Sequence, residues 1–87
     1  MSASFTAYVL QSASTGRYYT GQTADLERRL AEHTDGLSGY TKGRGPWNLV
    51  HQEEYSTRAE AMRRERFLKS GAGREWIKNN LALREHS

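Results

Sequence analysis

The sequence predicts a single α+β domain whose elements follow the order β-β-α-β-α-α. Residues 5–10 alternate in character like a short strand, and turn formers separate them from residues 17–20, which are rich in aromatic and β-branched side chains. A capping-box sequence at residues 57–60 opens a long helical segment. With 87 residues the chain has the size of one domain, and we expect residues 1–87 to form that domain.

The first two strands are predicted to form a hairpin, because a run of small and polar turn formers at residues 12–16 separates them. The register of this hairpin decides how two tyrosines lie. A turn centred between Ala13 and Ser14 places Tyr8 directly opposite Tyr19, with Cβ atoms about 4.5–5.5 Å apart, so that both hydroxyls reach one ligand. A turn centred on later residues separates the two tyrosines.

A helix is predicted to follow Gly21, which ends the second strand. Thr23 suits the N-cap, because its hydroxyl can accept a hydrogen bond from a free backbone N–H group. Asp25 and Glu27 then lie near the positive end of the helix dipole. We expect the helix to run to about His33.

Residues 34–46 are predicted to form a loop, because glycines recur through this segment. Two cations, Lys42 and Arg44, lie on it. A third strand is predicted over residues 47–55, where aromatic and β-branched side chains return.

Two further helices are predicted to complete the domain. Thr57 and Glu60 form a capping box in which each side chain satisfies the other's backbone N–H group. The glycines of residues 71–73 are expected to stop that helix, and residues 74–83 to form a short last one. Three apolar side chains of the last helix are expected to lie on the sheet: Trp76, Ile77 and Leu81.

Two chemically active side chains share the apolar stripe of the first helix. Arg29 and His33, one turn apart, lie on the face that carries Leu26 and Leu30, whereas Arg28 faces away. Packing alone offers one interpretation, in which Arg29 extends along the edge of the stripe and His33 interacts with the helix dipole. The occurrence of both on one stripe, after two tyrosines, favours a shared functional site.

A carboxylate lies on the predicted inner face of the second helix, where Glu65 falls between Ala61 and Leu68. A buried carboxylate needs a partner. One candidate is an ion pair with Lys69, four residues later, worth about 0.2–0.5 kcal/mol. The other is a divalent cation, because Mg²⁺ is commonly held by one or two carboxylates together with waters and substrate phosphate oxygens.

Composition indicates a polyanionic partner. Thirteen Lys and Arg exceed ten Asp and Glu, which gives a formal charge of +3 and a pI near 9.5. The chain has no cysteine, which excludes disulfides and thiolate metal sites. We find neither a leader pattern nor a run long enough to span a membrane, and we expect a soluble cytoplasmic protein.

Several common types of site lack support. The three histidines do not have the spacing of zinc ligands, and no phosphate-binding loop or nucleophile elbow is present. Most of the remaining aromatic residues are expected to pack in the core or at its rim rather than to stack on bases: Tyr18, Tyr40, Tyr55, Trp47 and Trp76.

The order of these residues resembles the GIY-YIG nuclease superfamily, and particularly its short stand-alone bacterial members. The two signature tripeptides would be residues 7–9, Ala-Tyr-Val, and residues 19–21, Tyr-Thr-Gly, of which the tyrosines and one glycine match literally. The resemblance covers about residues 6–80. It implies a three-stranded antiparallel sheet flanked by helices, in agreement with the element order above.

The resemblance also implies roles for individual residues. Tyr8 would help to activate the attacking water, with Tyr19 beside it and His33 able to accept or relay the proton. Arg29 would stabilise negative charge on the phosphorane, and Glu65 would hold Mg²⁺ or Mn²⁺. The late asparagine of the family would correspond to Asn80 in preference to its neighbour Asn79.

The expected function is therefore metal-dependent endonucleolytic hydrolysis of nucleic acid, DNA rather than RNA, for example in DNA repair. Five basic residues are expected to contact the nucleic acid: Lys42, Arg44, Arg58, Arg63 and Arg66. One alternative is a nucleic-acid-binding module on the same fold that does not cut, or that cuts only with a partner. Another is a subunit of a larger complex.

Overall fold

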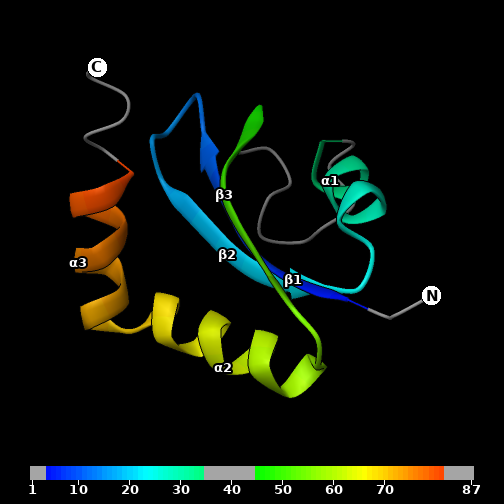
Figure 1. Cartoon of the computed structure of the whole chain (residues 1–87). Coiled ribbons are helices and arrows are strands. Elements are labelled where there is room, and N and C mark those ends of the chain that lie inside the picture. The colour runs from blue at the N-terminus through cyan, green and yellow to red at the C-terminus, as the bar shows by residue number, and fades with distance from the viewer. Residues whose placement is uncertain (1–3, 35–44, 82–87) are drawn as a thin grey trace.

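The computed structural model of the chain describes residues 4–34 and 45–81 (Figure 1). Its elements are three strands and three helices in the order β1 (Phe5–Ser12), β2 (Tyr18–Thr23), α1 (Leu26–Thr34), β3 (Trp47–Tyr55), α2 (Arg58–Lys69) and α3 (Gly71–Asn80). This order confirms the predicted β-β-α-β-α-α fold. The part of the predicted loop that carries Lys42 and Arg44 lies outside the described residues.

The three strands form one antiparallel sheet in the order β2-β1-β3, so β1 is central and β2 is an edge strand. Tyr8 pairs with Gly21, which centres the hairpin between Ser14 and Thr15. The register that places Tyr8 directly opposite Tyr19 is therefore wrong. The two tyrosines are instead diagonal neighbours on one face of the sheet.

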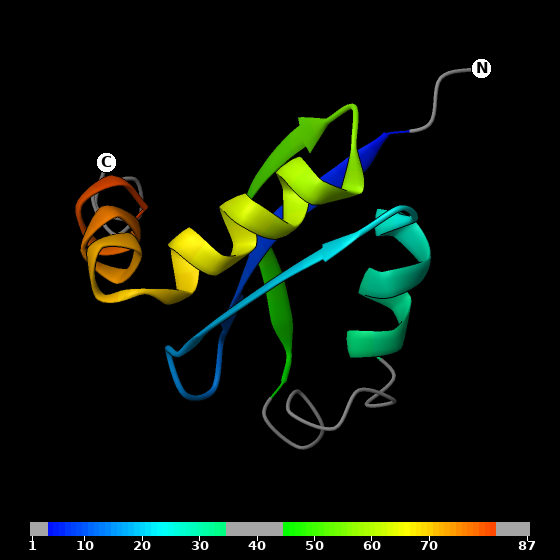
Figure 2. The ribbon, with the colours of Figure 1, turned by 90° about the horizontal axis from the view of Figure 1, so that it is seen from below.

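The two faces of β1 pack against different helices. The apolar core contains four buried residues from β1, α2, α3 and the C-cap of α3: Val9, Leu68, Ile77 and Leu81. Trp76 packs against this cluster, which confirms the predicted packing of the last helix. Tyr8 points to the opposite face and meets α1 there. Figure 2 shows α2 crossing the strands, with α3 continuing from its end.

The start of α1 corrects a prediction, because Asp25 rather than Thr23 caps the helix. Oδ1 of Asp25 accepts from the N–H of Arg28 at 3.1 Å, and its carbonyl accepts from the N–H of Arg29 at 3.1 Å. The hydroxyl of Thr23 accepts from the N–H of Asp25 at 3.1 Å. Thr23 thus closes the turn that leads from β2 into the helix.

The start of α2 agrees with the predicted capping box in one of its two bonds. The Thr57 hydroxyl accepts from the N–H of Glu60 at 3.2 Å. The Glu60 carboxylate accepts from the hydroxyls of Ser56 and Thr57, at 3.2 and 2.9 Å. The carboxylate of Glu60 therefore bonds to side chains at the cap and not, as predicted, to the backbone N–H group of Thr57.

The last helix begins three residues earlier than predicted, at Gly71 instead of Arg74. Ser70 ends α2 and opens α3, since its N–H donates to the carbonyl of Phe67 at 3.0 Å and its Oγ accepts from the N–H of Gly73 at 3.2 Å. A Cβ atom on Gly73 would lie only 1.9 Å from the Phe67 carbonyl oxygen. The glycines therefore allow two helices to meet at a tight corner.

No helix in residues 4–34 or 45–81 is both long enough and apolar enough to cross a membrane.

Candidate active site

A buried hydrogen bond joins β1 to α1 at the centre of the candidate site. The hydroxyl of Tyr8 lies 3.1 Å from Nε2 of His33. Tyr8 has no exposed surface, and His33 is 2% exposed. His33 reaches this position because it lies on the inner face of α1. It is a buried partner of Tyr8 and not a surface cation at the helix end.

Gly21 provides the space in which the Tyr8 ring lies. A Cβ atom on Gly21 would be 2.6 Å from the Tyr8 hydroxyl oxygen and 2.7 Å from Cζ, which is closer than real side-chain contacts. The phenol therefore extends across β2 at the one position of that strand's described pairing that has no side chain. This fit explains physically why Tyr8 pairs with Gly21 rather than with Tyr19.

Tyr19 covers the buried pair from the edge strand. Its ring centroid lies 4.8 Å from that of His33 and 6.4 Å from that of Tyr8, and the indole of Trp47 lies 6.4 Å away on another side. Tyr19 is partly exposed. Tyr18 packs against the apolar core on the other face of the sheet. The structure thus brings Tyr19, and not Tyr18, to His33.

Arg29 lies at the open edge of this cluster. Its Nη1 is 2.7 Å from Oε1 of Glu32, and its side chain is 34% exposed, against 78% for Arg28. Hydrogen bonding to Glu32, then to the hydroxyls of Tyr8 and Tyr19, raises the pKa of Arg29. Arg29 is therefore a permanent cation beside both phenols.

The electrostatics of the pair follow from burial. Burial raises the pKa of Tyr8 to about 12, although the guanidinium of Arg29 opposes this shift. Burial, and then the charge of Arg29, lowers the pKa of His33 below its usual 6.5. At neutral pH Tyr8 is therefore a neutral phenol and His33 a neutral imidazole. In the tautomer that carries its proton on Nδ1, Nε2 of the imidazole accepts from the phenol, and a proton path then exists between them.

Glu65 approaches the cluster from α2. Its negative charge also raises the pKa of Tyr8, by less than burial does. The carboxylate is 22% exposed, and Oε2 lies 2.9 Å from Nζ of Lys69. The ion pair that the sequence offered as one partner is thus formed. Tyr8, Tyr19, Arg29 and His33 are in direct contact, and Glu65 acts on Tyr8 through its charge.

The donor set around Glu65 permits one kind of metal site. Within residues 4–34 and 45–81, no three His, Cys, Asp or Glu side chains cluster as a ready metal cage. A partly exposed carboxylate suits a hard cation that keeps its waters and takes further oxygens from a phosphate. The residues therefore fit Mg²⁺ or Mn²⁺ arriving with a substrate, and they do not fit zinc.

The three predicted nucleic-acid contacts that lie in the described residues do not share one surface. Arg58 lies on the β2 side of α2, where its guanidinium bonds to Gln22 at 3.4 Å. Arg63 lines a hollow on the opposite flank with Tyr55, and Arg66 is exposed on the helix face that points away from the buried residues. Lys42 and Arg44 lie outside the described residues.

Asn80 bonds within its own helix, where its side-chain amide donates to the Trp76 carbonyl at 2.8 Å.

Sequence reasoning missed two residues of the site. Glu32 orients Arg29, and its position three residues later on one helix was a usable signal. The space above Gly21 had no such signal, because it depends on the strand register.

The chain matches the GIY-YIG catalytic domain over residues 4–79. It belongs to the GIY-YIG family. The matched range includes every residue of the site described above, from Tyr8 to Glu65. This family is one of nucleases, so its members act on nucleic acid in general.

Relatives of this GIY-YIG domain occur in archaea and bacteria. A UPF0213 protein of Halobacterium salinarum is 51% identical over 59 residues, which cover 67% of this chain and 75% of that protein. A UPF0213 protein of Natronomonas pharaonis is 45% identical over 71 residues, which cover 80% and 82%. The solution NMR structure of a UPF0213 protein from Bacillus halodurans superposes with a TM-score of 0.54 at 35% identity, over 87% and 83% of the two chains.

Proposed function

We propose that this GIY-YIG domain is a Mg²⁺- or Mn²⁺-dependent endonuclease that hydrolyses phosphodiester bonds in DNA. The observation that carries the proposal is the buried bond between the Tyr8 hydroxyl and Nε2 of His33, next to the guanidinium of Arg29. A proton acceptor and a fixed cation side by side are two of the groups that assist phosphodiester hydrolysis.

The proton of the attacking water would pass through Tyr8 to His33. The water oxygen forms a bond to phosphorus while its proton moves to the phenol oxygen, and the phenol proton moves to Nε2. The bond from phosphorus to the leaving oxygen then breaks, and solvent protonates that oxygen. With its pKa near 12, Tyr8 is too rarely ionised at neutral pH to act alone, so the neutral imidazole is the final base.

Charge on the phosphorane would be stabilised by Arg29, whose planar donors match phosphate oxygens. Glu32 holds that guanidinium at 2.7 Å and so limits its movement before substrate binds. Glu65 would hold the divalent cation, which supplies Lewis-acid stabilisation of the phosphoryl group when bound.

Access to Tyr8 requires a movement, because the residue has no exposed surface. The Tyr19 ring and α1 cover it. We propose that rotation of this ring or an outward shift of α1 admits the water once the nucleic acid is bound.

The test is a cleavage panel of supercoiled, single-stranded and branched DNA and of RNA, with Mg²⁺, Mn²⁺ or chelator. Glu65→Gln should lower the rate at least about 100-fold, and Arg29→Gln should lower it similarly. Glu75→Gln is the matched control, since Glu75 is an exposed carboxylate on α3. Equal rates in wild type and the Glu65 variant would mean that any cleavage is contamination.

The ion pair between Glu65 and Lys69 favours a second candidate, a nucleic-acid-binding module that does not cut. In this case Lys69 would remain the partner of the carboxylate, and no cation would displace it. Salt-dependent binding without cleavage under either metal ion supports this candidate. Cleavage that is lost with Glu65→Gln while binding persists excludes it.

A further inference from the structure

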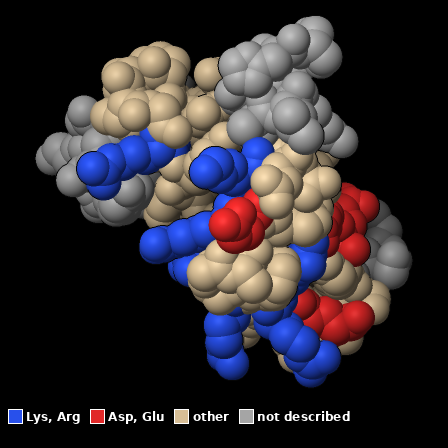
Figure 3. Space-filling view, turned by 90° about the vertical axis from the view of Figure 1, so that its left-hand side faces the viewer, with Lys and Arg blue, Asp and Glu red and all other residues tan. Residues whose placement is uncertain are grey.

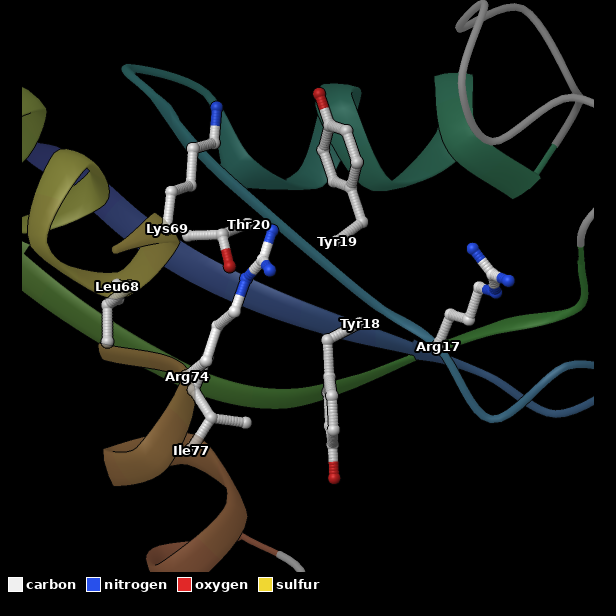
Figure 4. A pocket seen from close by; sticks show the side chains of 8 residues that line it. All are labelled: Arg17, Tyr18, Tyr19, Thr20, Leu68, Lys69, Arg74 and Ile77. Atoms are coloured by element: carbon white, nitrogen blue, oxygen red, sulfur yellow. The ribbon is translucent and has the colours of Figure 1, made fainter. Parts of the chain in front are cut away.

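A hollow of about 640 Å³ opens beside Tyr19, between β2 and the corner where α2 meets α3. It is lined by residues from these three elements and from the turn before β2: Arg17, Tyr18, Tyr19, Thr20, Leu68, Lys69, Arg74 and Ile77 (Figure 4). Figure 4 shows the Tyr19 hydroxyl pointing toward α1, while the Tyr18 ring points to the other side of β2.

The lining of this hollow is more cationic than that of the two other hollows described. Three cations line it, Arg17, Lys69 and Arg74, and no carboxylate does. The hollow beside Arg29 has three arginines but also Asp25 and Glu32. The hollow near Tyr55 has two arginines and a glutamate. An anion would therefore meet the least opposition between β2 and the α2–α3 corner.

The cations are presented from a rigid base. Leu68 and Ile77 form its buried floor as part of the apolar core, and Tyr18 packs on the same core. Lys69 and Arg74 lie on either side of the α2–α3 corner, where hydrogen bonds of Ser70 join the end of α2 to the start of α3. In the described residues, neither Arg17 nor Arg74 has a carboxylate within salt-bridge distance.

The hollow is continuous with the candidate site. Tyr19 belongs to its lining and also contacts His33. Lys69 lines it and holds Glu65 at 2.9 Å. An anionic polymer bound at the candidate site could therefore continue into this hollow, where Arg17 and Arg74 belong to the lining. The face of the molecule that carries α3 has Lys and Arg side chains spread over much of it (Figure 3).

We propose that this hollow binds the phosphodiester backbone of the substrate next to the bond that is cut, with Arg17 and Arg74 contacting phosphates. The inference rests on the proposed function and deepens it. It assigns the backbone contacts to the β2 side of the domain, whereas Arg63 and Arg66 on α2 lie away from this path.

The experiment compares two charge-matched double variants, Arg17→Gln with Arg74→Gln and Arg63→Gln with Arg66→Gln. Binding of fluorescent single-stranded and duplex DNA is measured by anisotropy in chelator, over a series of salt concentrations. Thermal unfolding of each variant verifies that it is folded. The chelator prevents cleavage, so the readout does not depend on activity.

The first pair should bind about tenfold more weakly than wild type near 100 mM salt. The slope of log K against log salt should fall by roughly 1.4–1.8, the amount expected for two lost phosphate contacts. The second pair should stay within about twofold of wild type. The inference holds if this difference appears with either probe that wild type binds.

Equal weakening in the two pairs would overturn the inference, because the effect would then come from net charge alone. It would leave the proposed nuclease function intact. Absence of binding by wild type to both probes would instead overturn the proposed function. The two failures are thus distinguishable.

Discussion

At the scale of single residues, the position of Tyr8 depends on an atom that Gly21 lacks. The phenol occupies the space that a side chain at position 21 would need, since a Cβ atom there would lie 2.6 Å from the Tyr8 hydroxyl oxygen. The hydroxyl reaches His33 only from this position, since the ring lies across β2 toward α1. The glycine of the second signature tripeptide is therefore part of the site although it bears no functional group.

Gly21→Ala should displace the Tyr8 ring and break its bond to His33. We expect overpacking to lower the free energy of unfolding by about 1–3 kcal/mol and cleavage to fall at least tenfold. Urea unfolding and the cleavage assay measure the two effects. Gly71→Ala is the control, because a Cβ atom there meets nothing within 4 Å. Equal effects of the two substitutions would contradict the proposed packing.

His33 should make stability depend on pH. Its pKa is lowered in the folded chain, so protonation favours the unfolded chain. The stabilisation is present above the unfolded pKa of about 6.5 and is lost as pH falls through the lower folded value, by at most about 1.4 kcal/mol per pH unit. Cleavage should also fall, because the protonated ring accepts no proton.

The measurement is urea unfolding between pH 7.5 and 5. His33→Gln should remove part of the acid-induced loss, and His51→Gln, which keeps the buried pair, should retain it. A wild-type free energy of unfolding that is flat over this range would show that His33 does not titrate on unfolding.

At the scale of elements, Ser70 couples two helices. Its backbone N–H donates to the last turn of α2, and its hydroxyl accepts from the first turn of α3. One residue thus fixes the angle of the corner that separates Lys69 from Arg74. Any change in this corner would alter the distance between these two cations.

Ser70→Ala should remove the cap of α3 and lower the free energy of unfolding by about 1 kcal/mol. It should also weaken DNA binding, because Arg74 follows the first turn of α3. Ser56→Ala, which removes an exposed hydroxyl bonded to Glu60, is the control. Chemical denaturation measures the stability and anisotropy measures the binding. Reduced stability with unchanged binding would show that the geometry of the corner does not affect DNA binding by the cationic hollow.

The sequence predicts the elements well and their ends less well. Alternation, β-branched and aromatic composition, and capping and glycine signals together place every strand and helix. The predicted N-cap at Thr23 and the predicted helix stop at residues 71–73 were wrong. Several neighbouring residues can cap a helix, and only the packing of the next element decides among them. From the sequence alone, Gly71 and Gly73 indicate the end of a helix. In the structure they lie within α3, and Gly73 allows the close approach of the Phe67 carbonyl.

The site was predictable where a helix face determines it. Helical spacing was sufficient to bring Arg29 and His33 to one side of α1. Strand register was not accessible, because it depends on the fit of the Tyr8 ring over Gly21. The cationic hollow was not predicted either, since Arg17 and Arg74 are far apart in the sequence and come to line one hollow only through the fold.

At the scale of the whole molecule, the two sides of the sheet are held differently. On one side α2 contacts all three strands and α3, over an aliphatic core. On the other side α1 meets the sheet through His33, Tyr8 and Tyr19. We therefore expect α1 to open more readily than α2.

Hydrogen exchange followed by mass spectrometry tests this difference. Amides of residues 26–34 should exchange faster than those of residues 58–69, and bound oligonucleotide should slow the former. Tyr8→Phe, which keeps the ring but loses the hydroxyl, should speed exchange of α1 without changing α2. Equal protection of both helices would mean that α1 opens only by global unfolding, and the proposed entry of water by an outward shift of α1 would fail.

The packing under α1 also bears on how such sequences diverge. Tyr8 and His33 fill the interior there, so a lineage that stopped cutting nucleic acid would still be selected to keep them for folding. Glu65 is partly exposed, so its substitution should not unfold the chain. Among homologues, a carboxylate at the position of Glu65 is therefore a better marker of an active nuclease than the tyrosine and histidine at the positions of Tyr8 and His33.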